Sequence, residues 1–234
     1  MLLRNILSRS PAVARAVPFV VFVLLTAAQG KFGAASAYWF YLAKTLVGLW
    51  LMLETWTLVP EMRWAFSWEA LVVGIGVLVM WIGLDPYYPK TDLLFAKLGF
   101  SSAPRPVLEN SNPNLVFGDH SPMAWFFMSV HLLGMTIVVP PLEEVFYRSF
   151  LYRFIAKSNF LDVPLNRFLP VPFFVTALVF GFEHSQWLAG ILCGMAYQWL
   201  VLRKNRLGDA MTAHAITNLM LGIWVVWRGA WNFW

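Results

Sequence analysis

Long apolar runs are the feature that most constrains the fold of this 234-residue chain. The runs 16–28, 38–59, 68–84 and 123–139 approach the roughly 20 residues that cross the hydrocarbon core of a bilayer. Helices and closed barrels satisfy their backbone hydrogen bonds there, and these runs lack the alternation of a barrel strand. Charged residues make up 12% of the chain, against about 25% in soluble domains. The sequence therefore predicts an all-α, polytopic transmembrane helical bundle of about seven to eight helices.

The later part of the chain continues this pattern after one polar interruption. Prolines, Ser, Asn and mixed charges mark residues 85–121 as an extramembrane loop that holds a short helix near 91–98. We predict a single membrane-embedded domain, with N-terminal helices in 1–84 and a helical catalytic core in 122–234. The helices expected in that core after 123–139 are 140–157, 172–184, 188–202 and 209–227.

Charge and cysteine content exclude several classes of protein. The net charge of +5 comes from basic residues scattered between apolar segments, so nucleic-acid binding is not expected. Arginines before the first apolar run place the N-terminus in the cytoplasm, and Arg203 and Lys204 are expected on the same side. The one cysteine, Cys193, lies in an apolar run and excludes disulfides and thiolate metal clusters. The chain is therefore expected to be a multi-pass integral membrane protein.

The segment that follows Pro140 and Pro141 carries the first polar cluster, Glu143, Glu144 and Arg148. Proline removes a backbone donor but suits the first turn of a helix, so the two prolines are expected either to kink the helix or to start a new one. Glu144 and Arg148 are four residues apart and can pair on one face. Glu143 points about 100° away and needs another partner. A charge at the bilayer centre costs about 2.5–3.5 kcal/mol, so the alternatives are a packing ion pair or a functional site.

Two later segments offer polar partners. His184 follows Glu183 at the end of a short apolar helix, and His214 and Asn218 are four residues apart, on one face of the last helix. Each cluster by itself is compatible with helix packing. Together they supply the groups that amide hydrolysis needs.

The residue types suggest a role for each side chain. A carboxylate such as Glu143 can activate water as a general base, and His184 can share that water or protonate the leaving amine. His214 and Asn218 can donate to a developing oxyanion, and Arg148 can hold Glu144 ionised. No cofactor is then required. Zinc is an open alternative, with Glu143, His184 and His214 as ligands around a site open to water, although no His-Glu-x-x-His sequence is present.

The ordered set Glu143-Glu144-x-x-x-Arg148, Phe180-x-x-x-His184 and His214-x-x-x-Asn218 resembles the CAAX protease and bacteriocin-processing family of intramembrane glutamic proteases. The resemblance covers residues 123–227. It implies a bundle of about eight helices with a water-accessible cavity. It also implies Glu143 and His184 as the groups that activate water, His214 and Asn218 at the oxyanion site, and no obligatory metal.

Two positions depart from the common family pattern, with Ser149 where Gly is frequent and Tyr147 where Phe is frequent. In addition, residues 81–86 resemble an exosortase-associated bacterial subgroup. Membership in this subgroup would place the protein in a bacterial inner (plasma) membrane. A membrane-anchored peptide or a sorting-system component would then be a more suitable substrate than a prenylated protein.

The sequence thus predicts an intramembrane endopeptidase that hydrolyses a peptide bond in a membrane-anchored protein or peptide by glutamate-activated water. Two alternatives stay open. One is a non-catalytic membrane binding or immunity protein on the same bundle, and the other is a zinc-dependent membrane metallopeptidase. The expected partners are the membrane-anchored substrate and the lipid bilayer.

Overall fold

The structure is a computed structural model that describes residues 2–100 and 112–234. Secondary structure in this described part is helical throughout, without strands, so the all-α prediction is confirmed. The described residues form two compact units, and neither is continuous in sequence. The first comprises residues 2–63, 112–146 and 218–234, and the second comprises 64–100 and 147–217. Residues 101–111 of the predicted extramembrane loop lie outside the described part.

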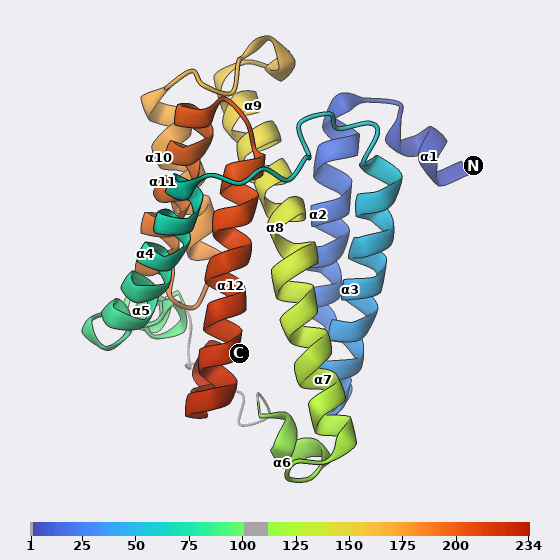
Figure 1. Cartoon of the computed structure of the whole chain (residues 1–234), viewed down its shortest axis with the longest axis vertical. Coiled ribbons are helices and arrows are strands. Elements are labelled where there is room, and N and C mark those ends of the chain that lie inside the picture. Colours follow the sequence, from blue (N-terminus) through green and yellow to red (C-terminus); the bar gives the residue numbers. More distant parts are fainter. Residues whose placement is uncertain (1, 101–111) are drawn as a thin grey trace. The chain divides into compact units, whose positions relative to one another are not determined.

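The first unit contains the N-terminal helices and the helix that carries the two glutamates (Figure 1). Its described elements are α1 (Leu2–Leu7), α2 (Pro11–Ala28), α3 (Ser36–Thr55), α6 (Pro113–Phe117), α7 (Pro122–Leu133), a π-helical turn (Gly134–Val138), α8 (Val139–Glu144), the later turns of α12 (Gly208–Arg228) and a 3-10 turn (Trp231–Phe233).

The second unit contains both histidine motifs. Its described elements are α4 (Trp68–Leu84), a 3-10 turn (Asp85–Tyr87), α5 (Thr91–Lys97), most of a second π-helical segment (Val145–Leu151), α9 (Tyr152–Ala156), a 3-10 turn (Phe160–Asp162), α10 (Pro170–Phe182), α11 (Trp187–Lys204) and the first turns of α12.

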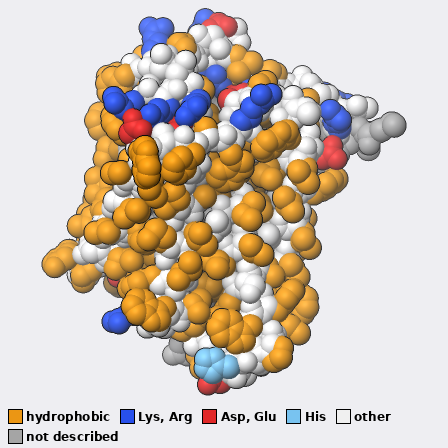
Figure 2. All heavy atoms as spheres, viewed as in Figure 1, with side chains coloured by type: hydrophobic (Ala, Val, Ile, Leu, Met, Phe, Trp, Pro, Cys, Tyr) orange, Lys and Arg blue, Asp and Glu red, His pale blue; other side chains and the backbone are white. Residues whose placement is uncertain are grey.

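Within residues 2–100 and 112–234, four helical runs are long and apolar enough to cross a membrane: Pro11–Ala28, Trp68–Lys97, Pro122–Ala156 and Gly208–Arg228. Large hydrophobic side chains on both units face outward, including Leu24 and Leu46 in the first and Val72 and Val79 in the second. Figure 2 shows such side chains over most of the visible face. Exposed apolar surface on this scale suits lipid, as expected for a multi-pass membrane protein. The helices α3 and α11, also predicted as spans, are long enough but fall outside this set.

Serine caps explain where several helices begin. The hydroxyl oxygens of Ser10, Ser67 and Ser121 accept from backbone N–H groups two or three residues later, at the starts of α2, α4 and α7. The first span therefore begins at Pro11, earlier than the predicted Ala16, because Ser10 caps it and proline occupies its first turn. Helix α4 has the predicted bounds, whereas α3 ends at Thr55 and not at the predicted Val59.

Buried charges of the first unit are held by polar groups of neighbouring helices. Arg15 makes a bidentate pair with Glu61, with both nitrogen–oxygen distances at 2.9 Å. Lys44 is also buried, and its Nζ donates to Thr26 Oγ1 at 3.0 Å and Gln29 Oε1 at 2.8 Å. The side chain stays inside because a hydroxyl and an amide lie within its reach.

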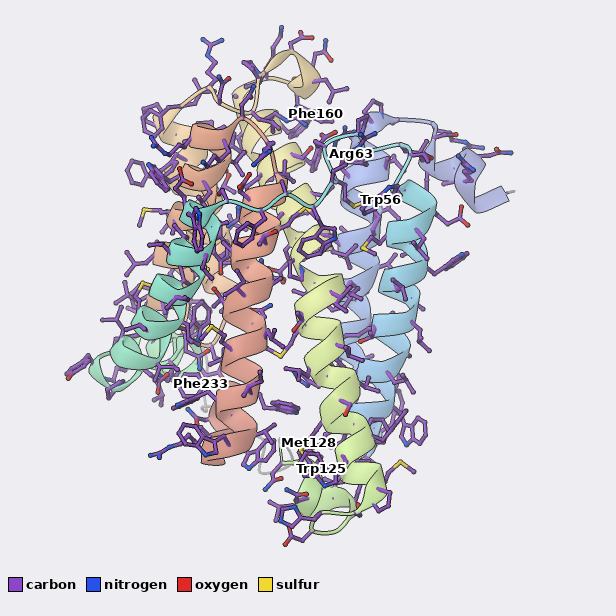
Figure 3. The ribbon with its side chains drawn as sticks, in the orientation of Figure 1. Trp56, Arg63, Trp125, Met128, Phe160 and Phe233 are labelled. Carbon is purple, nitrogen blue, oxygen red and sulfur yellow. The ribbon has the colours of Figure 1, made fainter. Side chains whose placement is uncertain are left out.

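A shallow apolar groove of about 280 Å³ lies between α7 and α12 within the first unit. Trp125 and Met128 line it from α7, and Ile223 and Trp227 line it from α12. Figure 3 labels Trp125 and Met128 near the start of α7. The groove contains one hydroxyl side chain, Ser129, among its lining residues.

Small residues bring the helices of the second unit close together. A Cβ added to Gly181 of α10 would lie 2.7 Å from the carbonyl oxygen of Trp187, and one added to Gly190 of α11 would lie 2.9 Å from Gly181 Cα. On α4, a Cβ on Gly74 would lie 2.7 Å from the carbonyl oxygen of Ala213. On the same helix, a Cβ added to Gly76 would have no described atom within 4 Å apart from its chain neighbours and its own helical backbone, so the close approach of α4 depends on Gly74.

Candidate active site

The acidic motif lies on α8, between two π-helical turns. Pro140 and Pro141 lie in the first turn of α8, inside the continuous helical run Pro122–Ala156. Glu143 and Glu144 follow in its second turn and are buried, with exposed fractions of 8% and 0%. Two adjacent buried carboxylates are costly in an apolar bundle unless other polar groups stabilise them.

The two prolines also alter the backbone just before the glutamates. The N–H of Val139 donates to the carbonyl of Gly134, five residues earlier, so it does not donate to the carbonyl of Met135. The next residue, Pro140, has no N–H to donate. The carbonyl of Met135 therefore lacks a helical donor, and Asn218 Nδ2 donates to it at 2.7 Å. The amide of Asn218 is thus oriented by one of its two N–H groups.

Arg148 belongs to the second unit and is buried among aromatic rings. Its guanidinium carbon lies 4.5 Å from the centre of the Phe180 ring and 5.8 Å from that of Tyr197. Its Nη2 donates to the carbonyl of Gly194 at 3.3 Å. Phe180 and Tyr197 thus provide a cation–π environment for a cation that is 1% exposed.

His184 lies in the connection between α10 and α11. Its Nδ1 is 2.7 Å from the carbonyl oxygen of Phe180. A carbonyl can only accept, so Nδ1 carries the hydrogen and Nε2 presents a lone pair. The imidazole packs against Phe180, with ring centroids 4.8 Å apart, and meets the ring of Trp81 edge-on at 5.4 Å. This tautomer suits a residue that accepts a proton through Nε2.

His214 is held by the same aromatic rings. It stacks on Tyr197 with centroids 5.1 Å apart and meets Phe180 edge-on at 6.2 Å. The hydroxyl of Tyr197 donates to Thr217 Oγ1 at 2.8 Å, and Thr217 donates to the carbonyl of Gly74 at 2.8 Å. This chain of hydrogen bonds fixes the ring on which His214 packs.

The six predicted site residues divide between the two units. Arg148, His184 and His214 share contacts with Phe180 in the second unit. Glu143, Glu144 and Asn218 belong to the first unit. His214 and Asn218 lie one turn apart on α12. The predicted Glu144–Arg148 pair and the common water of Glu143 and His184 stay predictions.

Metal ligation was the alternative use of the acidic and imidazole groups. Among the described residues, no group of three His, Cys, Asp or Glu side chains could hold a metal ion. The alternative zinc set joins Glu143 of one unit with His184 and His214 of the other. That set stays an untested alternative.

Both departures from the family pattern have partners in the second unit. The hydroxyl of Tyr147 donates to a carboxylate oxygen of Glu183, next to His184. Ser149 is fully buried, and its Oγ accepts from Arg153 Nη2 at 2.6 Å. Sequence reasoning missed Tyr197 and Thr217, because an aromatic or a threonine in an apolar helix gives no local signal of such a role.

The comparisons with known proteins support one family. Residues 124–220 match the family model described as Rce1-like, type II CAAX prenyl endopeptidase Rce1-like. The matched range includes Glu143, Glu144, Arg148, His184, His214 and Asn218. It excludes the first 123 residues of the chain. No curated protein and no solved structure matches the chain.

Proposed function

We propose that this protein is an intramembrane endopeptidase, because residues 124–220 match the Rce1-like type II CAAX prenyl endopeptidase family. It hydrolyses a peptide bond in a membrane-anchored protein or peptide. The observation that carries the proposal is the grouping of Arg148, His184 and His214 around Phe180, inside the range that matches the family.

The proposed mechanism begins with the two groups that handle protons. Glu143 is the general base that activates water, because a carboxylate can accept the proton that the attacking water loses. His184 assists through Nε2, because its Nδ1 is committed to the carbonyl of Phe180. After water attacks the scissile carbonyl, the proton passes to the leaving amine.

The remaining groups stabilise negative charge in the site. His214 and the second N–H of the Asn218 amide donate to the oxyanion, and such a donor contributes about 2.7–4 kcal/mol to transition-state stabilisation. Arg148 pairs with Glu144 and holds its carboxylate in place. No step in this scheme requires a metal.

The proposed site lies in a membrane bundle of about seven to eight helices, in which α3, α10 and α11 join the four runs described above. The N-terminus is cytoplasmic and the protein resides in a bacterial plasma membrane. The substrate is anchored in the same membrane, because a substrate reaches a site among membrane-embedded helices either laterally or from the membrane surface.

The test compares wild-type and Glu143→Gln proteins in cells, with the new N- and C-termini of membrane proteins determined by mass spectrometry. Glu143→Gln keeps the size of the side chain and removes the base, so at least one cleaved terminus should disappear. Glu54→Gln, an acid-to-amide change on α3, is the matched control and should leave that terminus unchanged.

Three outcomes separate the candidate functions. A terminus that persists in the Glu143→Gln cells contradicts the glutamate mechanism. Stoichiometric zinc in the purified protein, together with loss of cleavage on chelation, would favour the metallopeptidase. A membrane protein that co-purifies uncut with both proteins would favour a binding role.

A further inference from the structure

The connection that carries His184 is fastened to a segment far away in sequence. The hydroxyl of Thr91, at the start of α5, lies 2.6 Å from the carbonyl oxygen of His184 and 3.1 Å from that of Ser185. The N–H of Thr91 donates to the carbonyl of Ser185 at 3.0 Å. Thr91 is buried, with an exposed fraction of 8%. One residue thus holds two consecutive carbonyls beside the imidazole.

The residues just before Thr91 hold the start of α11 in the same way. The indole Nε1 of Trp187 donates to the carbonyl of Pro89 at 2.9 Å, and the N–H of Ala189 donates to the hydroxyl of Tyr88 at 3.4 Å. The rings of Tyr88 and Trp187 meet edge-on, with centroids 5.7 Å apart. Residues 88–91 therefore contact both the turn between α10 and α11 and the first residues of α11.

This segment is itself fixed locally. Lys90 Nζ donates to the carbonyl of Asp85 at 2.7 Å and pairs with the carboxylate of the same residue. It also lies 4.9 Å above the ring of Tyr88. A few residues earlier, Trp81 of α4 supplies the ring that meets His184 edge-on. Trp81, Asp85, Tyr88 and Lys90 belong to the second unit, as does His184, but these four residues precede the range that matches the family.

We infer that Thr91 is a positioning residue for His184. Its hydroxyl fixes the backbone of residues 184 and 185, so that Nδ1 keeps its bond to Phe180 and Nε2 keeps one direction. The inference rests on the proposed function for its effect on activity, because it gives His184 a role in catalysis. The bonds themselves do not depend on that function.

The experiment replaces Thr91 by valine or by serine in the full-length protein. Thr91→Val preserves shape and removes the hydroxyl, whereas Thr91→Ser keeps the donor. The matched control is Thr55→Val on α3, since Thr55 is buried and its hydroxyl also faces two carbonyl oxygens, of Leu51 at 2.8 Å and Met52 at 3.2 Å. Thr55 belongs to the first unit.

Two measurements are made on each variant. The first is kcat and KM for the substrate found in the experiment above, and the second is the tautomer of His184 by nitrogen-15 NMR with labelled histidine. The chain has four histidines, so the His184 signals can be assigned by comparison with His184→Gln. Neither the tautomer nor its assignment requires activity.

Thr91→Val should lower kcat by about 10- to 100-fold, as small displacements of a catalytic group do, with KM nearly unchanged. It should also deplete the Nδ1-protonated tautomer of His184. Thr91→Ser should restore both properties, and Thr55→Val should leave both as in the wild type. Loss of stability without a change in tautomer would assign Thr91 a purely structural role and overturn the inference.

The experiment distinguishes failure of the proposed peptidase function from failure of the positioning role of Thr91. If no protein, including the wild type, cleaves a substrate but the tautomer shifts in Thr91→Val, the proposed function fails and the positioning role stands. If Thr91→Val does not fold, Tyr88→Phe tests the same segment, because it removes the hydroxyl that accepts from Ala189. The inference is overturned if the folded Thr91→Val variant keeps the wild-type tautomer and kcat. The same result in Tyr88→Phe overturns it if Thr91→Val does not fold.

Discussion

At the scale of single residues, proline and asparagine are coupled through one carbonyl. Pro140 denies the carbonyl of Met135 a helical donor, and Asn218 supplies one from another part of the sequence. A proline in a helical run normally weakens the helix, yet here it gives the half-buried amide of Asn218 a fixed acceptor. The sequence Pro-Pro before the two glutamates thus has a consequence beyond the first turn of α8.

We predict that Pro140→Ala lowers peptidase activity without lowering stability. The new N–H can bond the carbonyl of Met135 or Thr136, worth about 0.5–1.5 kcal/mol, and it competes with Asn218 for its acceptor. Activity and the free energy of unfolding are measured together. Pro122→Ala, at the first position of α7 where no donor is needed, is the control and should match the wild type in activity. Full activity of Pro140→Ala would show that the Asn218–Met135 bond has no role in catalysis.

At the scale of helices, the second unit depends on the close approach of α10 and α11. A Cβ on Gly181 would lie 2.3 Å from Ile191 Cγ1 and 2.8 Å from the N atom of the same residue. Because part of this contact is with backbone, a side-chain rotation cannot relieve it. The two helices would have to separate, and His184 follows Gly181 by one turn.

We therefore predict that Gly181→Ala destabilises the protein by about 1–3 kcal/mol, the usual cost of overpacking. Gly76→Ala on α4 should be neutral or stabilising by up to about 1 kcal/mol, because alanine favours a helix and no described atom lies within 4 Å of the new Cβ. Unfolding of the two variants in the same detergent measures the difference. Equal stability would contradict the tight packing of α10 on α11.

At the scale of the whole molecule, the basic residues predict orientation in the membrane. The helical run Pro122–Ala156 separates the connection that contains Asp119 from the basic connection that contains Asn166. From Arg153, Lys157 and Arg167 we predict that the second connection is cytoplasmic. The two connections should then face opposite sides of the bilayer.

Cysteine labelling tests this topology. Cys193 is the one native cysteine, so Cys193→Ala provides a cysteine-free background. A membrane-impermeant maleimide should label Asn166→Cys in inverted vesicles and Asp119→Cys in right-side-out vesicles. Both positions are exposed in the structure. Labelling of both from the same side would contradict a crossing by residues 122–156.

Much of the helical framework could be predicted from the sequence. The bounds of α4 agree with the apolar run, and the helical run Pro122–Ala156 continues through Pro140 and Pro141, so the prolines do not separate two helices. The early start of α2 was missed because the Ser10 cap extends the helix beyond its apolar run. The six candidate site residues were identified by type and order. Their roles stay predictions, as do the Glu144–Arg148 pair and the exosortase-type subgroup.

What the sequence determined by itself is helical structure and the identity of the polar residues in it, because periodicity, capping and proline chemistry act between near neighbours along the chain. What only the tertiary structure decided is which distant group satisfies each buried polar atom. Thr91 and His184, Asn218 and Met135, and Lys44 and Thr26 are paired across 93, 83 and 18 residues, respectively. A buried donor takes whichever acceptor the packing brings near, and that choice leaves no pattern in the local sequence.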